Sequence, residues 1–451
     1  MQQRVSSLLQ RRPLERGALI LLITSAASYA LGLLRDRSLA GAFGASGTLD
    51  AYQASFILPD LIFNVFVAGA LSAAFLPVFT HLRTHRRNQA AARLAGVLLT
   101  LGCLVLLIIG LAGFIFAHQL TSVVAPGFAP AGQQLLANLT RIMLLSPLLF
   151  LISNLLGNML ISTKSFFFYG LSPALYNLGI VLGIVLLSPS FGIYGAAWGT
   201  VLGAALHLAA RLLGSHRAQL TVQLNLRITP EMKKVLRLML PRLVGLTATQ
   251  VQLWAFVAIA STLGEGAVTV HSLARNFQSF PVSLIGIALA TSLFPLLATS
   301  ASRGARGEFT EQLRWGVFLT LAATIPAALG IYLLRQPIIA FFVGTGAFDA
   351  SAITATAWVL GVYTLSIPTE SLLHLLSRSF YALHNTLIPT VISVVSLAVS
   401  IIAAYFLVIP LHIAGLPAGF AIGTALQVAL LAGLLPIYSR RQFKPPYTPG
   451  V

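Results

Sequence analysis

One spacing of isoleucine and glycine occurs twice in the chain, 220 residues apart. It reads Ile193-Tyr194-Gly195-Ala196-Ala197-Trp198-Gly199-Thr200-Val201-Leu202-Gly203 and, later, Ile413-Ala414-Gly415-Leu416-Pro417-Ala418-Gly419-Phe420-Ala421-Ile422-Gly423. Glycine at every fourth position leaves a strip of helix surface without side chains, so that a second helix can approach closely. We expect these glycines to serve helix packing, and their recurrence suggests two related halves.

Two further pairs of motifs recur at nearly the same offset. Ser172-Pro173-Ala174 corresponds to Ile388-Pro389-Thr390, and Ala74-Phe75-Leu76-Pro77 corresponds to Leu293-Phe294-Pro295. One such pair would carry no weight, because glycine and proline are frequent in membrane helices. Three pairs near one offset predict a sequence repeat. The predicted domains are a first six-helix lobe, a basic linker and a second six-helix lobe, at residues 1–214, 215–235 and 236–451.

The composition between these motifs is that of a membrane protein. Of the 451 residues, 57% are hydrophobic and only 8% are charged. Soluble domains carry about a quarter charged residues. The excess apolar surface must therefore face lipid, and the sequence predicts an all-α polytopic membrane protein.

Runs of about 20 apolar residues mark the expected membrane-spanning helices. Proline interrupts two of them, 51–79 and 268–300, which we expect to be bent. Six spans in each half give the two repeats the same orientation. The twelve predicted spans are 17–34, 51–79, 95–118, 135–162, 167–188, 191–214, 236–263, 268–300, 313–334, 352–382, 387–408 and 413–437.

The basic residues indicate how the chain is oriented. With twelve spans, 23 of the 28 Lys and Arg residues fall on the side that holds both termini. Lys and Arg accumulate on cytoplasmic loops, so both termini are predicted to be cytoplasmic. The first apolar run could alternatively be a signal peptide, because basic residues precede it and Ala-Ser-Tyr-Ala lies within it.

Five arginines depart from this distribution: Arg35, Arg37, Arg141, Arg275 and Arg335. A charged side chain within a span is costly and usually faces a bundle interior or a wet cavity. Arg37 and Arg335 could instead extend to the outer headgroups. Arg275 lies a few residues inside a predicted span and is the strongest candidate for a functional charge.

The sequence does not favour an enzyme or a cofactor site. It contains no G-x-x-x-x-G-K-[ST] loop, so the protein does not hydrolyse nucleotides itself. Cys103 is the only cysteine, which excludes an internal disulfide and makes a cysteine-based metal cluster implausible. The basic residues form short runs between apolar segments, rather than the stripes that nucleic-acid binding requires.

The balance of charges near the spans favours an anionic cargo. The acidic candidates are few, namely Asp36, Asp50, Asp60, Glu265 and Glu370. Arginine grips phosphate with its planar fork and stays charged when buried, whereas a cation carrier needs a buried carboxylate. Asp50 could instead cap a helix. Glu370 lies one turn before His374, and the two could relay protons or form a simple polar contact.

Several segments resemble the MurJ/MviN lipid II flippase family. The resemblance covers nearly the whole chain in order. It rests on Leu31-Gly32-Leu33-Leu34-Arg35-Asp36, Phe43-Gly44-Ala45-Ser46, Leu49-Asp50-Ala51-Tyr52, Leu58-Pro59-Asp60-Leu61, the run Gly69–Phe79, Ala125-Pro126-Gly127-Phe128, Ser172–Asn177, Ala274-Arg275 with Phe280-Pro281, and Ser379-Phe380-Tyr381-Ala382.

This resemblance implies the two-lobed fold of the multidrug/oligosaccharidyl-lipid/polysaccharide exporter superfamily, with a central cavity. It also implies alternating access that moves undecaprenyl-pyrophosphate-linked peptidoglycan precursor across the bacterial cytoplasmic membrane. Arg35 and Arg275 match the family's cavity arginines, Arg141 takes a position that is commonly basic, and Asp50 matches a family aspartate. We expect the two cavity arginines to hold the pyrophosphate, with Arg141 and Asp50 supporting or gating them.

The chain also departs from the family pattern. Family arginines fall on Tyr29, Phe63 and Asn64, and a family acid falls on Ala68. The chain stops after twelve predicted helices, whereas typical members add two. The expectation is therefore a monomeric flippase for lipid II without a cofactor, coupled to membrane potential or an ion gradient. The alternatives are a flippase for another lipid-linked oligosaccharide and a degenerate, non-transporting membrane scaffold.

Overall fold

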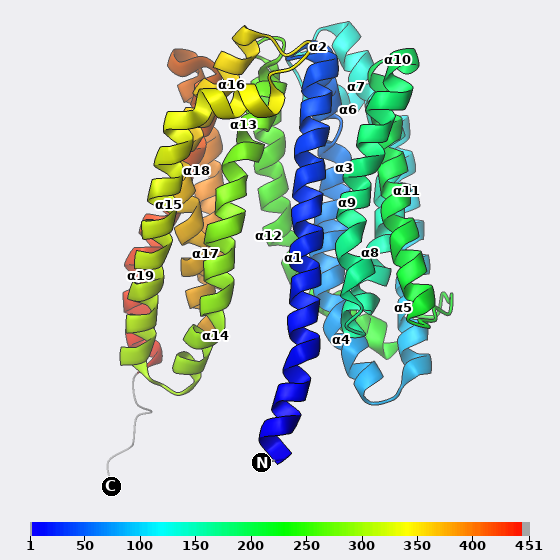
Figure 1. The fold of residues 1–451 in the computed structure, drawn as a ribbon, viewed down its shortest axis with the longest axis vertical. Helices are drawn as coiled ribbons and strands as arrows, with labels where there is room; N and C mark the ends of the chain where they lie inside the picture. The colour runs from blue at the N-terminus through cyan, green and yellow to red at the C-terminus, as the bar shows by residue number, and fades with distance from the viewer. Residues whose placement is uncertain (1, 444–451) are drawn as a thin grey trace. The chain divides into compact units, whose positions relative to one another are not determined.

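The computed structural model of the protein describes residues 2–443. Within this range, the side chains of 2–16, 18, 68–73, 238, 240–242, 244, 245 and 441 are not described, and Ala68 is among them. The described part is built from helices and connecting loops and contains no strand, as predicted for an all-α protein (Figure 1).

The chain forms two compact units by packing. The first comprises Met1–Gly266 with Thr345–Phe348, and the second comprises Ala267–Gly344 with Asp349–Val451. Short π-helical stretches are labelled η. The helices of the first unit are α1 (Gln2–Phe43), α2 (Gly47–Ala54), α3 (Ile57–Ile62), η1 (Phe63–Leu71), α4 (Ser72–Thr84), α5 (Asn88–Ile115), α6 (Ala117–Val124), α7 (Pro130–Met143), α8 (Ser146–Ser162), α9 (Phe166–Leu182), η2 (Gly183–Leu187), α10 (Ser188–Phe191), α11 (Ile193–Arg217) and α12 (Pro230–Ser261).

The second unit is likewise helical. A short 3-10 helix, η4, joins its last two long helices, which lie side by side. Its elements are α13 (Ala267–Pro281), η3 (Val282–Ile287), α14 (Ala288–Ser302), α15 (Arg306–Val343), α16 (Ala350–Tyr363), α17 (Ser366–Ala382), α18 (Leu387–Leu411), η4 (His412–Ala414) and α19 (Gly415–Gln442).

Eight helical segments of the described part are long and apolar enough to cross a membrane. A ninth is formed by α16 and α17 if this pair, bent by 44°, counts as one span. The segment Leu387–Arg440 contains both α18 and α19. The polytopic membrane architecture is therefore confirmed, and most predicted spans coincide with these segments.

Two predicted spans are not among these segments, and both contain residues whose side chains are not described. The segment 51–79 is divided among α2, α3, η1 and α4. In α12 the described apolar stretch is Leu246–Ser261, which directly follows residues whose side chains are not described.

The proline-containing segments show the expected irregularity. A π-helical stretch follows α3 in the first unit, and another follows Pro281 in the second, close to the offset of the glycine motifs. Proline lacks the N–H that would close a regular helical turn. A π-helical turn changes the helical register and commonly accompanies a bend.

Both glycine motifs lie at close helix contacts, as predicted. A Cβ on Gly199 would lie 2.8 Å from the Cα of Gly183, where α11 meets the end of α9. A Cβ on Gly419 would lie 2.4 Å from the backbone nitrogen of Ala404, where α19 meets α18. Each motif therefore allows close approach of two long helices within its own unit.

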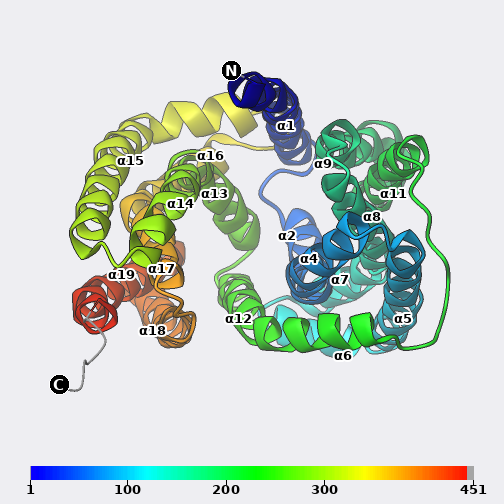
Figure 2. The same ribbon diagram turned by 90° about the horizontal axis from the view of Figure 1, so that it is seen from below.

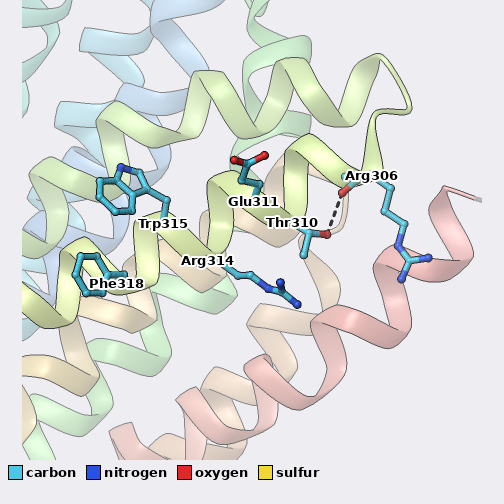
Figure 3. A pocket seen from close by; sticks show the side chains of 7 residues that line it. Arg306, Thr310, Glu311, Arg314, Trp315 and Phe318 are labelled. Carbon is cyan, nitrogen blue, oxygen red and sulfur yellow. Dashed lines mark hydrogen bonds between the residues drawn. The ribbon is translucent and has the colours of Figure 1, made fainter.

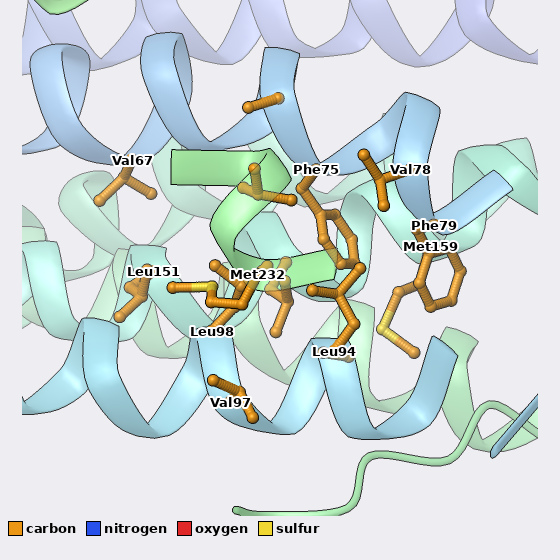
Figure 4. Close-up of a cluster of buried hydrophobic side chains, with 14 of the residues drawn as sticks. Val67, Phe75, Val78, Phe79, Leu94, Val97, Leu98, Leu151, Met159 and Met232 are labelled. Carbon is orange, nitrogen blue, oxygen red and sulfur yellow. The ribbon is translucent and has the colours of Figure 1, made fainter. Parts of the chain in front are cut away.

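Each unit has its own hydrophobic core. In the first, Phe75, Phe79 and Leu94 pack with side chains of α8 and with Met232 of α12 (Figure 4). In the second, a separate cluster around Phe309 and Phe380 joins α14, α15, α17 and α19.

The predicted linker at 215–235 contains an irregular segment, residues 220–229, between α11 and α12 (Figure 2). Its Gln223 N–H donates to the carbonyl oxygen of Ala92 on α5 at 3.1 Å. Because Met232 and Val235 are buried in the first core, α12 packs with the first unit. The boundary between the two packed units thus lies after Gly266. The domain boundaries predicted from the sequence repeat, at 214 and 235, remain a prediction.

Candidate functional site

Arg35 lies near the C-terminal end of α1 and is held by two side chains. Its Nε and Nη2 donate to Oδ1 of Asp36 at 2.9 and 2.7 Å, and Nη1 donates to Oδ1 of Asn177 at 3.0 Å. Asn177 lies on α9 and donates from Nδ2 to the carbonyl oxygen of Ser28 at 3.1 Å. The arginine is therefore fixed where α1 packs on α9.

The guanidinium of Arg35 remains partly accessible, with 26% of its side chain exposed, whereas Asp36 is 8% exposed. Burying an arginine without a counter-charge is costly. Asp36 offsets that cost, so this predicted substrate residue is already neutralised by a neighbour on its own helix.

A small cavity lies in the same unit, among α3, η1, α7, α8, α9 and α11. Tyr176 lines it, next to Asn177 in the chain, and the buried Oγ of Ser146 in its wall has no hydrogen-bond partner. The other lining residues are Phe56, Pro59, Asp60, Phe63, Met143, Pro147, Phe150 and Thr200.

Aromatic packing occupies one of the positions where the family pattern has arginine. Phe63 packs against Phe150 with ring centroids 4.9 Å apart, and Asn64 is half-buried. Tyr29 is 51% exposed on α1. These three positions supply no cation, and Ala68 lies outside the described side chains.

Arg275 of α13 forms the corresponding site of the second unit. Its Nη1 and Nη2 donate to Oε2 and Oε1 of Glu370 on α17 at 2.9 and 2.8 Å, a two-pronged contact. Nη1 also donates to Oε1 of Gln278. The rings of Phe420 and Tyr363 lie 4.4 and 5.9 Å from the guanidinium carbon.

Gln278 joins this cluster together. It is fully buried one turn after Arg275, and its Nε2 donates to Glu370 Oε2 at 2.8 Å and to Ser366 Oγ at 3.1 Å. Arg275 is thus the hydrogen-bonded partner of Glu370, which also interacts electrostatically with the predicted neighbour His374. Nothing in the sequence predicts the pair of Arg275 and Glu370, which are 95 residues apart.

Asp50 makes a backbone contact. It is fully buried in α2, and its Oδ2 accepts a hydrogen bond from the N–H of Gly266 at 2.6 Å. The N-cap of α2 is Ser46, whose side chain accepts from Leu49 N–H. Asp50 therefore anchors the loop after α12. This contact favours a structural role for Asp50 over direct contact with a substrate.

Arg141 contacts the end of a neighbouring helix. Its Nε donates to the carbonyl oxygen of Phe114 near the end of α5 at 3.1 Å, and its Nη1 donates to Asn138 Oδ1 at 3.1 Å. A cation at a helix C-terminus stabilises the carbonyl groups there. No hydrogen bond among the described residues joins Arg141 to Arg35.

One of the 23 basic residues that the sequence places on the cytoplasmic side is a buried arginine, Arg211. Arg211 lies inside α11 and is only 4% exposed. Its Nη1 donates to the carbonyl oxygen of Ser153 at 2.9 Å and to Asn154 Oδ1 at 3.2 Å, and Tyr169 covers one face at 5.0 Å. It ties α11 to α8 and α9.

A surface hollow of the second unit contains none of the predicted site residues. It lies along the first turns of α15, beside Arg306, Arg314, Trp315 and Phe318 (Figure 3). Exposed tryptophan together with arginine is typical of a helix end at the lipid headgroups. Among the described residues, no group of three His, Cys, Asp or Glu side chains could hold a metal ion.

Comparison with known proteins identifies the family. Residues 39–444 match the family model described as "Lipid II flippase MurJ". The chain is 29% identical to the lipid II flippase MurJ of Burkholderia cenocepacia, over 90% of this chain and 80% of that protein. It is 30% identical to the probable lipid II flippase MurJ of Bdellovibrio bacteriovorus, over 95% of this chain and 83% of that protein.

Solved structures show the same fold. A lipid II flippase MurJ in an inward closed conformation superposes with a TM-score of 0.80 at 22% identity, covering 94% of this chain and 89% of that one. An inward-facing multidrug transporter of the MATE family gives 0.79 at 14% identity, with coverages of 94% and 98%. The match of residues 39–444 to the family model establishes that the chain belongs to the lipid II flippase MurJ family.

Proposed function

We propose that this protein is a flippase for lipid II, the undecaprenyl-pyrophosphate-linked peptidoglycan precursor. The family match over residues 39–444 is the observation that carries this proposal. The arginines add a chemical reason, because each unit holds one partly accessible arginine against a carboxylate. A guanidinium fork suits the oxygens of a pyrophosphate.

In the proposed mechanism, Arg35 and Arg275 bind the pyrophosphate in turn or together during alternating access. Membrane potential or an ion gradient drives the cycle. Arg141 and Asp50 support the binding states through the helix end and the loop that they contact. No covalent step is required, so the protein acts as a transporter without a cofactor and is not an enzyme.

The proposed setting is the bacterial cytoplasmic membrane, with both termini on the cytoplasmic side and the chain acting as a monomer. The distribution of basic residues supports this orientation. Exposed apolar side chains along the spans, such as Leu333 and Phe406, support contact with lipid.

A flippase for another lipid-linked oligosaccharide is the second candidate. It is favoured by the residues at the family's arginine positions, where Phe63 packs on Phe150 and Tyr29 carries no charge. A substrate site with fewer arginines would bind a different lipid headgroup. A non-transporting scaffold is the third candidate and predicts no dependence on Arg35 or Arg275.

The test is rescue of a bacterium depleted of its own lipid II flippase, with growth and lipid II accumulation as readouts. We expect rescue by the wild-type chain, loss of rescue with Arg35→Ala and with Arg275→Ala, and normal rescue with the surface variant Arg314→Ala. Equal membrane levels of all variants must be verified by immunoblot. Rescue by both site variants would overturn the site assignment, and failure of a well-expressed wild-type chain would overturn lipid II as the cargo.

A further inference from the structure

The contact between Arg275 and Glu370 has the two-pronged geometry with which arginine also binds phosphate. Two parallel N–H donors of the guanidinium meet two carboxylate oxygens at 2.9 and 2.8 Å. Phosphate presents a comparable pair of oxygens to the same fork. A phosphate cannot use this fork while Glu370 occupies it.

Side chains other than Glu370 also hold Arg275. Gln278 accepts a hydrogen bond from Nη1 through Oε1, and Ser366 in turn fixes the amide group of Gln278 at 3.1 Å. Phe420 covers the guanidinium at 4.4 Å. The arginine is therefore pre-oriented, and its carboxylate partner can be exchanged without releasing the side chain.

The pair is also accessible enough for exchange. The side chain of Arg275 is 25% exposed and that of Glu370 is 13% exposed. A pyrophosphate carries more negative charge than one carboxylate and can form the same two-pronged contact, so it can compete for the fork.

We propose that Glu370 is a resident counter-ion, which occupies the fork of Arg275 without cargo and is displaced by the phosphate of an anionic lipid headgroup. This inference rests on the proposed function and adds a residue that sets affinity and release. Glu370 returns to Arg275 when the headgroup leaves, so the charge of the arginine is compensated in both states.

Displacement creates a charge that must be balanced. A buried carboxylate without a partner is strongly disfavoured and takes up a proton. The other titratable or charged described side chains of this cluster are His271 on α13, Tyr363 on α16, and His374 and Arg378 on α17. We therefore expect headgroup binding to be accompanied by proton uptake, and affinity in the wild type to fall as pH rises.

The experiment measures binding of undecaprenyl pyrophosphate to the purified full-length chain in nanodiscs between pH 6 and pH 8.5. Glu370→Gln keeps the size of the side chain and removes its charge. We expect Glu370→Gln to bind undecaprenyl pyrophosphate about tenfold more tightly than wild type at pH 8. The affinity of wild type should fall by up to about tenfold per pH unit, and Glu370→Gln should lack this pH dependence. The ionisation of the pyrophosphate itself affects both proteins equally and cancels in the ratio of their affinities.

Two controls accompany this comparison. Glu231→Gln removes the carboxylate of a pair with Arg87 in the first unit, at 3.7 Å, and should bind as wild type does. Undecaprenol, which lacks phosphate, should not distinguish any of the proteins. If Glu370→Gln is poorly stable, the readout is the rise in its melting temperature on adding inorganic pyrophosphate, which should exceed that of wild type.

The outcomes separate this inference from the proposed function. Suppose that wild type binds undecaprenyl pyrophosphate and that Arg275→Ala abolishes this binding. If Glu370→Gln then binds no more tightly than wild type, and its melting shift with pyrophosphate is unchanged, the counter-ion role alone is overturned. Absence of any binding that distinguishes undecaprenyl pyrophosphate from undecaprenol in wild type overturns the proposed headgroup site and the inference with it. Tighter binding by Glu370→Gln, with loss of the pH dependence, supports both.

Discussion

At the scale of single residues, the contacts of Asp50 favour a structural role over a role in substrate binding. Its carboxylate accepts the N–H of Gly266 at 2.6 Å in a fully buried position. Gly266 has φ +84°, and a Cβ there would lie 2.6 Å from the carbonyl oxygen of Ala45. The loop is thus held in a conformation that only glycine adopts readily.

We expect Asp50→Ala to lower the free energy of unfolding by about 1–3 kcal/mol, because the buried N–H of Gly266 loses its acceptor. Asp50→Asn keeps an acceptor oxygen and should lose less. Thermal unfolding in detergent measures both, with exposed Glu311→Ala as the control, expected to be near wild type. A normal melting temperature in Asp50→Ala together with lost transport would show that this carboxylate acts on the cargo.

Arg35 and Arg275 were identified from sequence because they violate the distribution of basic residues, and Asp36 adjoins Arg35 in the chain. Their other partners could not be predicted. Asn177 is 142 residues from Arg35, and Glu370 is 95 residues from Arg275. Such contacts depend on which helices pack together and on side-chain orientation, neither of which follows from a hydrophobic run.

At the scale of helices, the glycine motifs determine how closely two helices can pack. Gly419 of α19 leaves room for the backbone of Ala404 on α18, and Gly423 leaves room for Ser400. The sequence predicted this role because glycine at every fourth position follows one face of a helix. The same spacing serves α11 against α9 in the first unit.

Gly419→Ala should therefore destabilise the second unit by about 1–3 kcal/mol, because its Cβ would overlap backbone atoms that cannot rotate away. Gly330→Ala, in the middle of α15 with no atom within 4 Å of its Cβ, is the matched control. It should be neutral or stabilising by up to about 1 kcal/mol, because alanine favours the helix. Equal melting temperatures for the two variants would contradict the packing role.

The helix scale also shows where apolar runs are insufficient. The run 51–79 was predicted as one bent span, but the chain divides it into α2, α3, η1 and α4. Proline marked the irregularity in advance. The positions of the breaks depend on local backbone hydrogen bonds, such as Asp60 N–H to the carbonyl oxygen of Phe56 at 2.8 Å, which composition does not encode.

At the scale of the whole chain, the repeated motifs predicted two related halves, and packing does form two units. The packing boundary differs from the linker that joins the sequence repeats, because Met232 and Val235 of α12 complete the core of the first unit. Burial of these side chains is a property of the folded core, whereas the repeat offset records only correspondence between positions in the chain.

The orientation of the chain gives a prediction at this largest scale. In a Cys103→Ser background, a single cysteine can be placed at Ser190 in α10 or at Ser302 at the end of α14, both of which are exposed. The distribution of basic residues places position 190 outside and position 302 in the cytoplasm. We expect a membrane-impermeant maleimide to label Ser190→Cys in intact spheroplasts, and to label Ser302→Cys only after permeabilisation. Labelling of Ser302→Cys before permeabilisation, with Ser190→Cys protected, would mean that the termini lie outside. Arg306 and Arg314 at the start of α15 would then face the outer leaflet, contrary to the accumulation of Lys and Arg on cytoplasmic loops.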